Sequence, residues 1–158
     1  MKKVIAVLVL LMLTLVMCTG LAFAGEKARD GRFIAYDNGT VLDTRTNLMW
    51  AARDNGSDIN WANAKSYCEN YRGGSYNDWR MPTQDELAGL YDVSKRYETD
   101  CNLPVMISGL IRLTCVFVWA SETRGSEAAV FAFPLGYEIW YQQSYNDGRR
   151  ALPVRSGK

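Results

Sequence analysis

The sequence predicts an α+β domain in which two helices pack on a small, mainly antiparallel sheet with long loops. Strand patterns come first and last in the region that follows the N-terminal segment, and two helical patterns lie between them. Removing an expected leader of 24 residues from the 158 leaves 134, enough for one domain with a core and too few for two. Five Trp, nine Tyr and five Phe supply the large rings with which a small, loop-rich domain packs.

Residues 1–24 are typical of a secretory signal. Lys2 and Lys3 precede an apolar run, and residues 22–24 have the small-x-small pattern of a cleavage site, so we expect cleavage before Gly25. An uncleaved membrane anchor is the competing interpretation, but the apolar run is short for a membrane span. We therefore expect a secreted or periplasmic protein with no stable membrane insertion after cleavage.

The charge and composition of the processed chain exclude several classes of function. Of 18 basic side chains, Lys2 and Lys3 leave with the signal, so 16 basic residues stand against 17 acidic ones. This balance attracts neither nucleic acid nor an anionic membrane. The sequence has no histidine, so it cannot by itself build a His-dependent triad, a His-ligated zinc site or a histidine general base.

No cofactor or metal site is predicted. No glycine-rich phosphate loop followed by Lys and Ser or Thr is present. The turn-rich segment 53–58 carries Asp, Asn and Ser oxygens that could bind calcium. It lacks the alternating carboxylates and the distal Glu of an EF-hand loop, so a plain loop is favoured.

The first elements predicted are strands. Residues 25–31 are polar and charged and are expected to form a flexible leader before a domain of residues 32–158. A tight turn at residues 37–39 and a second turn before Leu48 separate three strands, in which Trp50 should be buried: residues 32–36, 40–43 and 48–51.

The first helix is predicted over residues 61–71, with Asn60 as its N-cap. Gly73 and Gly74 mark its end. Its inward positions follow helical spacing, and they are Trp61, Ala64, Cys68 and Tyr71. A short polar linker then leads to the second helix.

The second helix is predicted over residues 84–92 by a capping box. The Thr83 hydroxyl can cap the helix while Glu86 reaches back to the Thr83 amide. Trp79, just before this start, is expected to fill the core. Arg80 is expected to hydrogen-bond loop carbonyls, a structural role rather than a catalytic one.

The C-terminal part is predicted to be strands. Residues 94–113 are irregular, and four short strands with turns between them follow: residues 116–120, 128–133, 137–141 and 150–154. The order of strands, two helices and strands is what favours the α+β class over alternating parallel units.

The processed chain contains an odd number of cysteines: Cys68, Cys101 and Cys115. A disulfide between Cys101 and Cys115 is the expected pairing, because it closes a short loop and would stabilise the fold by roughly 3 kcal/mol. Cys68 then remains on the first predicted helix, where a buried free thiol is favoured over a reactive group.

Six motifs occur in a fixed order along most of the processed chain. They are Asp37-Asn38-Gly39-Thr40-Val41 with Asp43 and Thr44, Thr46-Asn47-Leu48-Met49-Trp50, Trp61-Ala62 with Ala64 and Tyr67-Cys68, Asp78-Trp79-Arg80-Met81-Pro82-Thr83 with Glu86-Leu87, Trp119-Ala120-Ser121-Glu122 and Leu152-Pro153-Val154-Arg155. Together they resemble the bacterial Lcl C-terminal domain family, which takes its name from a collagen-like surface adhesin and is catalogued as a domain of unknown function.

The resemblance implies a C-type-lectin-like fold. The start of the second helix is similar to that of formylglycine-generating and sulfatase-modifying domains. Asn47 stands where the family usually has Gly, and Asn also tolerates a left-handed turn. Pro153 stands where some members have a cysteine that could pair with the one at Cys68, which agrees with a free thiol there. The calcium-dependent sugar motifs of true C-type lectins, Glu-Pro-Asn and Trp-Asn-Asp, are absent.

The function expected from these observations is a non-enzymatic, adhesin-like binding module for glycans or surface proteins. Near the C-terminus, Tyr and Trp offer flat apolar faces beside Gln and Asn, which offer hydrogen bonds. The expected ligand-binding residues are Trp140, Tyr141, Gln142, Gln143, Tyr145 and Asn146. The alternative is that every second residue packs the core and the others form a soluble edge.

Two other functions remain open. An oxidase of the formylglycine-generating type rests on the resemblance alone. Such enzymes use a reactive cysteine pair late in the domain, and residues 116–158 contain no cysteine. A structural envelope component, whose partner is another copy or another domain, is the third.

Overall fold

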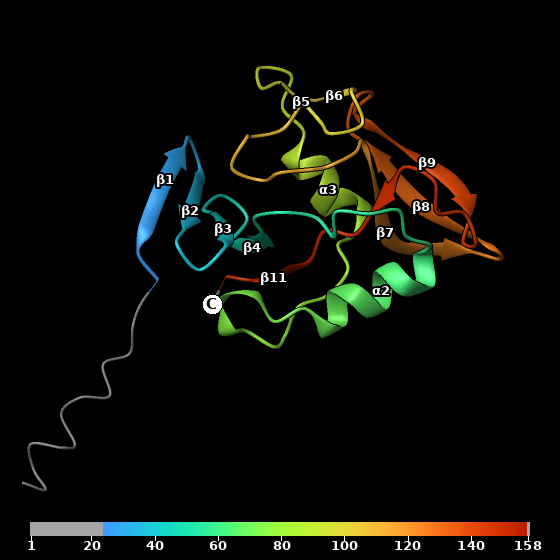
Figure 1. Cartoon of the computed structure of the whole chain (residues 1–158), viewed down its shortest axis with the longest axis horizontal. Coiled ribbons are helices and arrows are strands. Elements are labelled where there is room, and N and C mark those ends of the chain that lie inside the picture. The colour runs from blue at the N-terminus through green and yellow to red at the C-terminus, as the bar shows by residue number, and fades with distance from the viewer. Residues whose placement is uncertain (1–23, 158) are drawn as a thin grey trace, which may run out of the picture.

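The computed structural model describes residues 24–157, and apart from Ala24 the expected signal lies outside this part (Figure 1). Two helices and two main sheets form the described part, so the predicted α+β class is confirmed. One sheet has the strand order β1-β2-β3-β4-β11, and the other has the order β10-β7-β8-β9. The sequence predicted one sheet with mainly antiparallel pairing. The pairing within both sheets is antiparallel except between β10 and β7, which run parallel.

The first sheet contains the predicted N-terminal strands almost residue for residue. Its members are β1 (Glu26–Asp30), β2 (Phe33–Tyr36), β3 (Thr40–Asp43), β4 (Leu48–Ala51) and β11 (Val154–Ser156). Val41 of β3 lies opposite Trp50 of β4, and both are buried. Trp50 is only 1% exposed, as the sequence predicted. These residues face the main core.

The flexible leader predicted for residues 25–31 is wrong, because most of it forms strand β1. Glu26 to Asp30 pairs antiparallel with β2 at the edge of the first sheet. Asp30 is anchored further, by an ion pair with Lys95 and by the Ser108 hydroxyl, which donates to it at 2.8 Å. These two bonds, that from Lys95 first, lower the pKa of Asp30. An exposed edge strand needs no apolar side chains, so its polar sequence resembled a loose leader.

The second sheet is covered on both faces. Its strands are β7 (Phe117–Arg124), β8 (Glu127–Ala132), β9 (Tyr137–Gln142) and β10 (Arg149–Arg150). Along β8, Ala129 and Phe131 face the main core, which the two sheets share with helix α3 (Gln84–Leu90). Ala128 and Val130 face a second cluster beneath helix α2 (Trp61–Asn70). A strand buried on both sides has an unbroken apolar sequence, and Ala128 to Phe133 shows one.

The last predicted strand, residues 150–154, is wrong in its bounds and in its sheet. The chain makes the short strand β10 beside β7, crosses the core at Leu152, and only then makes β11 beside β4. Ala51 N donates to Pro153 O at 3.0 Å in the crossing. The C-terminal segment therefore belongs to both sheets, which short-range patterns do not reveal.

Both helices begin where the sequence predicts and end slightly earlier. Helix α2 (Trp61–Asn70) has Asn60 as its N-cap, whose side chain accepts from Asn63 N at 3.0 Å. Helix α3 (Gln84–Leu90) has the predicted capping box between Thr83 and Glu86. Each helix stops at a tyrosine with extended backbone. Helix α3 packs on β7 and β8, and α2 packs on the other face of β7.

The irregular region after α3 contains two short strands and the predicted disulfide. Strands β5 (Tyr97–Glu98) and β6 (Pro104–Val105) pair with each other. Cys101 is bonded to Cys115, as expected, and Cys68 is a buried free thiol. The bond ties this loop to the segment that enters β7.

Candidate functional site

The segment from Trp79 to Thr83, here called the corner, lies between α2 and α3. Trp79 is 3% exposed, and its Nε1 donates to Gly73 O at 3.1 Å. The rings of Tyr71 and Tyr76 pack edge-on against it. Arg80 makes two backbone bonds with Val154, through N (2.9 Å) and O (3.0 Å). The corner is thereby joined to β11 and fixed in place.

Arg80 and Glu86 hold the start of α3. Arg80 Nη1 and Nη2 donate to the Glu86 carboxylate at 2.8 and 2.5 Å, and Glu86 also accepts from Thr83 N at 2.9 Å. Arg80 Nη1 lies 3.3 Å from Met81 O, so the expected carbonyl contact is present and is the longer one. The main partner of Arg80 is therefore Glu86, which the sequence predicted only as part of the capping box.

The Arg80–Glu86 pair predicts a pH-dependent stability. Burial alone would raise the pKa of Glu86, but the bonds from Arg80 and Thr83 lower it below the usual value. Its stabilisation is therefore present above the unfolded-state pKa and lost as pH falls through the folded-state pKa. Arg80 is 45% exposed, so we expect Glu86→Gln to cost only about 0.5–1 kcal/mol at pH 7.

Urea denaturation of the wild type and the Glu86→Gln variant from pH 7 to pH 3 tests this. The two free energies of unfolding should converge in the acidic part of that range. A difference that stays constant would show that the charge of Glu86 plays no part. Asp85→Asn, at the exposed neighbouring position, is the matched control and should change little.

The motif Trp119-Ala120-Ser121-Glu122 connects β7 to the corner and to both helices. Trp119 Nε1 donates to Ile59 O at 2.8 Å, just before α2. Ser121 N donates to Pro82 O at 2.9 Å. Both carboxylate oxygens of Glu122 lie 3.1 Å from Gln84 N, the first amide of α3. Trp119, Glu122 and the backbone of Ser121 thus serve the scaffold.

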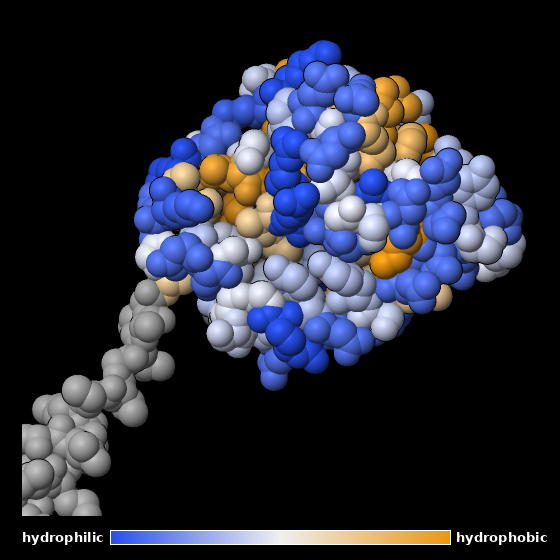
Figure 2. All heavy atoms as spheres, in the orientation of Figure 1, coloured by the Kyte–Doolittle hydropathy of each residue, from blue (hydrophilic) through white to orange (hydrophobic). Residues whose placement is uncertain are grey.

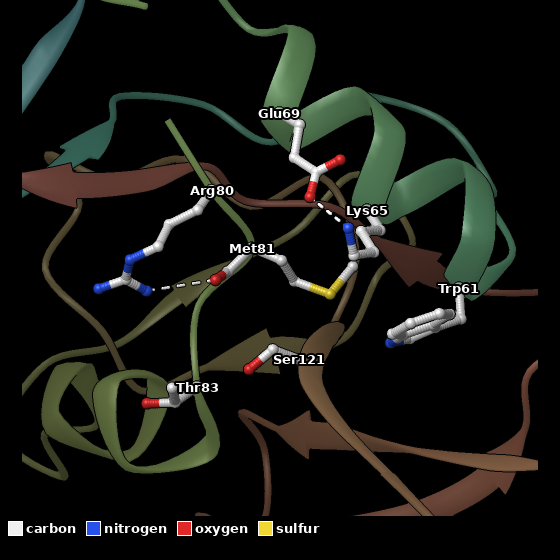
Figure 3. Close-up of a pocket in the computed structure, with 7 residues that line it drawn as sticks. All are labelled: Trp61, Lys65, Glu69, Arg80, Met81, Thr83 and Ser121. Carbon is white, nitrogen blue, oxygen red and sulfur yellow. Dashed lines mark hydrogen bonds and ion pairs between the residues drawn. The ribbon is translucent and has the colours of Figure 1, made fainter. Parts of the chain in front are cut away.

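A pocket of about 330 Å³ lies where α2, the corner and β7 meet (Figure 3). Its lining comes from all three, together with the cap of α3: Trp61, Lys65, Glu69, Arg80, Met81, Thr83 and Ser121. Trp61 and Lys65 on α2 face Met81 and Ser121 across the opening. The wall is mainly apolar, and charged and hydroxyl groups converge at its rim.

Trp61 is held rigidly in this pocket. Its Nε1 donates to Ala120 O at 2.9 Å, and its backbone N donates to Gln143 O at 3.1 Å. One helical turn away, Lys65 and Glu69 form an ion pair along the rim. An indole that is fixed at its polar end and partly buried, with the rest of its ring lining the pocket, is a preformed contact surface, because little rotamer freedom is lost on binding.

The acidic and thiol groups in and near the pocket are already engaged or buried. Its only carboxylate, Glu69, is already paired with Lys65. Cys68, on the same helix, faces the core, where burial raises the pKa of its thiol to about 12 and keeps it protonated. Within residues 24–157 no group of three or more Cys, Asp or Glu side chains is placed to hold a metal ion.

The residues expected to bind a ligand on the last long strand do not form one surface. Trp140 packs towards the main core and under Arg124, whose guanidinium carbon lies 4.4 Å from its ring centre. Tyr141 packs on the opposite face of the sheet. The Gln143 amide is used within the fold, since it donates to Gly125 O and Glu127 O at 3.2 Å. Gln142 and Asn146 are exposed.

Two of these expected residues do come together. The rings of Tyr141 and Tyr145 lie 5.9 Å apart. Beside them, the buried guanidinium of Arg149 lies 4.0 Å from the Tyr141 ring centre and 4.6 Å from that of Tyr145. Tyr145 is 50% exposed, so one of its faces remains open to solvent. This tyrosine pair is what remains of the expected strand site.

The pocket residues on α2 were missed as a set. Trp61, Lys65 and Glu69 are four residues apart, so they form one stripe along the helix. That spacing was visible in the sequence. Trp61 was assigned to the core because it begins the apolar face, and the contribution of Ser121 from β7 depends on tertiary structure.

Comparison with protein families places most of the described residues in one of them. The family model described as the Lcl C-terminal domain matches residues 39–155. None of the curated proteins compared matches the chain. Among the described residues, no helix is long and apolar enough to cross a membrane.

Proposed function

The chain belongs to the Lcl C-terminal domain family, and from this premise we propose that it is a non-enzymatic module that binds glycans outside the cytoplasm. The C-type-lectin-like architecture that the family resemblance implies is part of this proposal. So is the export of the chain, which the disulfide between Cys101 and Cys115 supports, because such bonds persist in oxidising compartments.

The observation that carries the proposal is the composition of the Trp61 pocket. A sugar ring has an apolar face of C–H groups and a rim of hydroxyls that both donate and accept hydrogen bonds. The pocket offers the exposed part of the Trp61 ring to such a face, and Lys65, Glu69 and Ser121 to such a rim. Its volume of about 330 Å³ is at the lower end of the range for ligand sites and suits a group of one or two rings.

The cysteines of residues 24–157 are not placed for the chemistry of the alternative, an oxidase. Cys101 and Cys115 are joined to each other, and Cys68 is buried. An oxidase of the formylglycine-generating type would need a free, accessible cysteine pair near its substrate. A surface protein that presents an aromatic side chain is the other ligand class that the pocket could take.

A glycan array tests the proposal with the processed chain from Gly25 onward, which includes every described element. The wild type should bind at least one class of immobilised oligosaccharide. Trp61→Ala should reduce that binding at least tenfold, which corresponds to about 1.4 kcal/mol. Lys65→Ala should have a smaller effect, because Glu69 and Ser121 remain.

Matched variants separate the pocket from the strand site. Trp140→Ala removes a half-buried tryptophan outside the pocket and should leave binding unchanged. If Tyr141→Ala or Tyr145→Ala abolishes binding while Trp61→Ala does not, the tyrosine pair is the site. Wild-type protein that is folded by circular dichroism but binds nothing on the array would refute glycan recognition.

A further inference from the structure

Strand β9 leaves one long edge of the second sheet open. It is the terminal strand in the order β10-β7-β8-β9, and it spans six residues, Tyr137 to Gln142 (Figure 1). The other outer strands of the two sheets differ from it. The edge strand β1 carries four charged residues among its five, and β10 has only two residues. The outer side of β11 is paired at Val154, which forms a β-bridge with Arg80.

The register shows which backbone groups of β9 face outward. Gln143 N donates to Ser126 O at 2.9 Å, one step beyond the pair Glu127–Gln142. Hydrogen-bonded and non-bonded pairs alternate in an antiparallel ladder. Tyr137, Ile139 and Tyr141 therefore bond to β8. The backbone groups of Glu138 and Trp140 and the N–H of Gln142 point to the open side, where Gln142 O already accepts from Tyr145 N at 2.9 Å and keeps a second lone pair for another donor.

Exposed apolar side chains gather around this edge. Among the described residues, five large hydrophobic side chains are strongly exposed, and three of them lie on β9 or within three residues of it: Leu135 (51%), Tyr137 (55%) and Tyr145 (50%). Figure 2 shows a mainly hydrophilic surface with a few separate apolar patches, one of them over the end where β8 turns into β9. Apolar surface beside an open edge is a pairing site unless something covers it.

We propose that β9 pairs antiparallel with β9 of a second copy of this chain, so that the two four-stranded sheets become one. The outward backbone groups allow a two-fold register centred on Trp140. In that register, Glu138 lies opposite Gln142 of the second copy, and Ile139 lies opposite Tyr141 of the second copy. No like charges meet, and each pair matches carboxylate with amide or apolar with aromatic, which stabilises cross-strand neighbours.

The self-complementarity of β9 favours a second copy over an unrelated peptide. The strand carries a single charge, Glu138, and the two-fold axis places it against a neutral hydrogen-bond donor rather than against itself. A contact of this kind is the same patch on both subunits, which closes at two copies and cannot extend into a filament.

The dimer is tested by sedimentation velocity of the processed chain over about 1–100 μM, a range that detects moderate affinities. The wild type should shift from the mass of one chain to that of two. Glu138→Pro removes an N–H that only the second copy would use, and proline is tolerated at such outward positions on edge strands. It should raise the dimer dissociation constant at least tenfold, whereas Glu138→Ala, the matched control, should raise it far less, because it removes the side-chain pair but keeps the N–H.

A second pair of variants leaves the backbone untouched. Gln142→Glu would place a carboxylate opposite Glu138 of the second copy and should weaken the dimer several-fold. Gln142→Lys should strengthen it, because it creates two symmetric ion pairs. A wild type that stays monomeric throughout the range overturns the proposal. So does a dimer that Glu138→Pro and Gln142→Glu leave unchanged.

Discussion

Replacing Asp54 with alanine is expected to lower the free energy of unfolding by about 3–5 kcal/mol. Asp54 is 5% exposed, and its carboxylate accepts from Thr114 N (2.7 Å), Thr114 Oγ1 (2.9 Å) and Gly56 N (2.9 Å). Arg150 Nε donates to the same Thr114 hydroxyl at 2.7 Å and lies 4.0 Å from the carboxylate. The variant would leave three donors and a nearby guanidinium without their acceptor.

The direction of the Thr114 hydroxyl sharpens this prediction. Since its oxygen accepts from Arg150, its proton must point to Asp54. Both oxygens of Asp54 are therefore acceptors, and Asp54→Asn would place an amide N–H₂ against a donor. Although burial raises the pKa of Asp54, the loss should remain large for both variants, because the donors stay buried.

Urea denaturation with the linear extrapolation measures the effect. Asp58→Asn is the matched control, because Asp58 binds the same Arg150 at 2.6 Å but its side chain is 47% exposed. That variant should cost less than about 1 kcal/mol. Equal losses in Asp54→Ala and Asp58→Asn would show that burial does not decide the contribution of this network.

Replacing Trp119 with alanine is expected to cost a similar amount, about 3–5 kcal/mol, for a different reason. Trp119 is fully buried in the cluster where Ala64 and Cys68 of α2 meet Met81. Its truncation opens a cavity beneath the helix and leaves Ile59 O without its indole donor. Helix α2 should therefore loosen more than the rest of the fold.

Two substitutions separate the contribution of the buried ring volume from that of the indole hydrogen bond and of burial. Trp119→Phe keeps most of the volume and removes the indole N–H, so it should cost about half as much or less. Trp140→Ala removes a tryptophan from a half-buried position and should cost less than Trp119→Ala. Hydrogen exchange of the α2 amides, compared with those of β8, would show whether the loosening is local. Uniform exchange across both elements would contradict that expectation.

The parts of the fold that local chemistry determines could be predicted from the sequence. The capping box at Thr83 and Glu86, the Asn60 cap and the turn between β2 and β3 are all decided within a few residues. The disulfide followed from the number of cysteines and from loop length. Strand β1 could not be recognised, because its partner and the anchor of Asp30 at Lys95 lie elsewhere in the chain.

The candidate site was harder to predict for the same reason. Its walls come from α2, the corner and β7, and no short motif contains all three. The sequence predicted a binding site on β9 because several aromatic and amide side chains follow one another there. Successive side chains of a strand point to opposite faces of the sheet, so Trp140 and Tyr141 lie on different faces although they are neighbours in the sequence.

The C-terminal segment supplies a strand to each of the two sheets, so both sheets are completed late in synthesis. Strand β4 lacks its outer neighbour until residues 154–156 have been synthesised, and β7 lacks one until residues 149–150 have. A growing chain therefore exposes an unpaired edge on each sheet until these residues have been made. Folding of this kind is slow, because the decisive contacts join distant parts of the chain. One short C-terminal segment therefore completes both sheets, and neither can reach its final pairing before the other by more than a few residues.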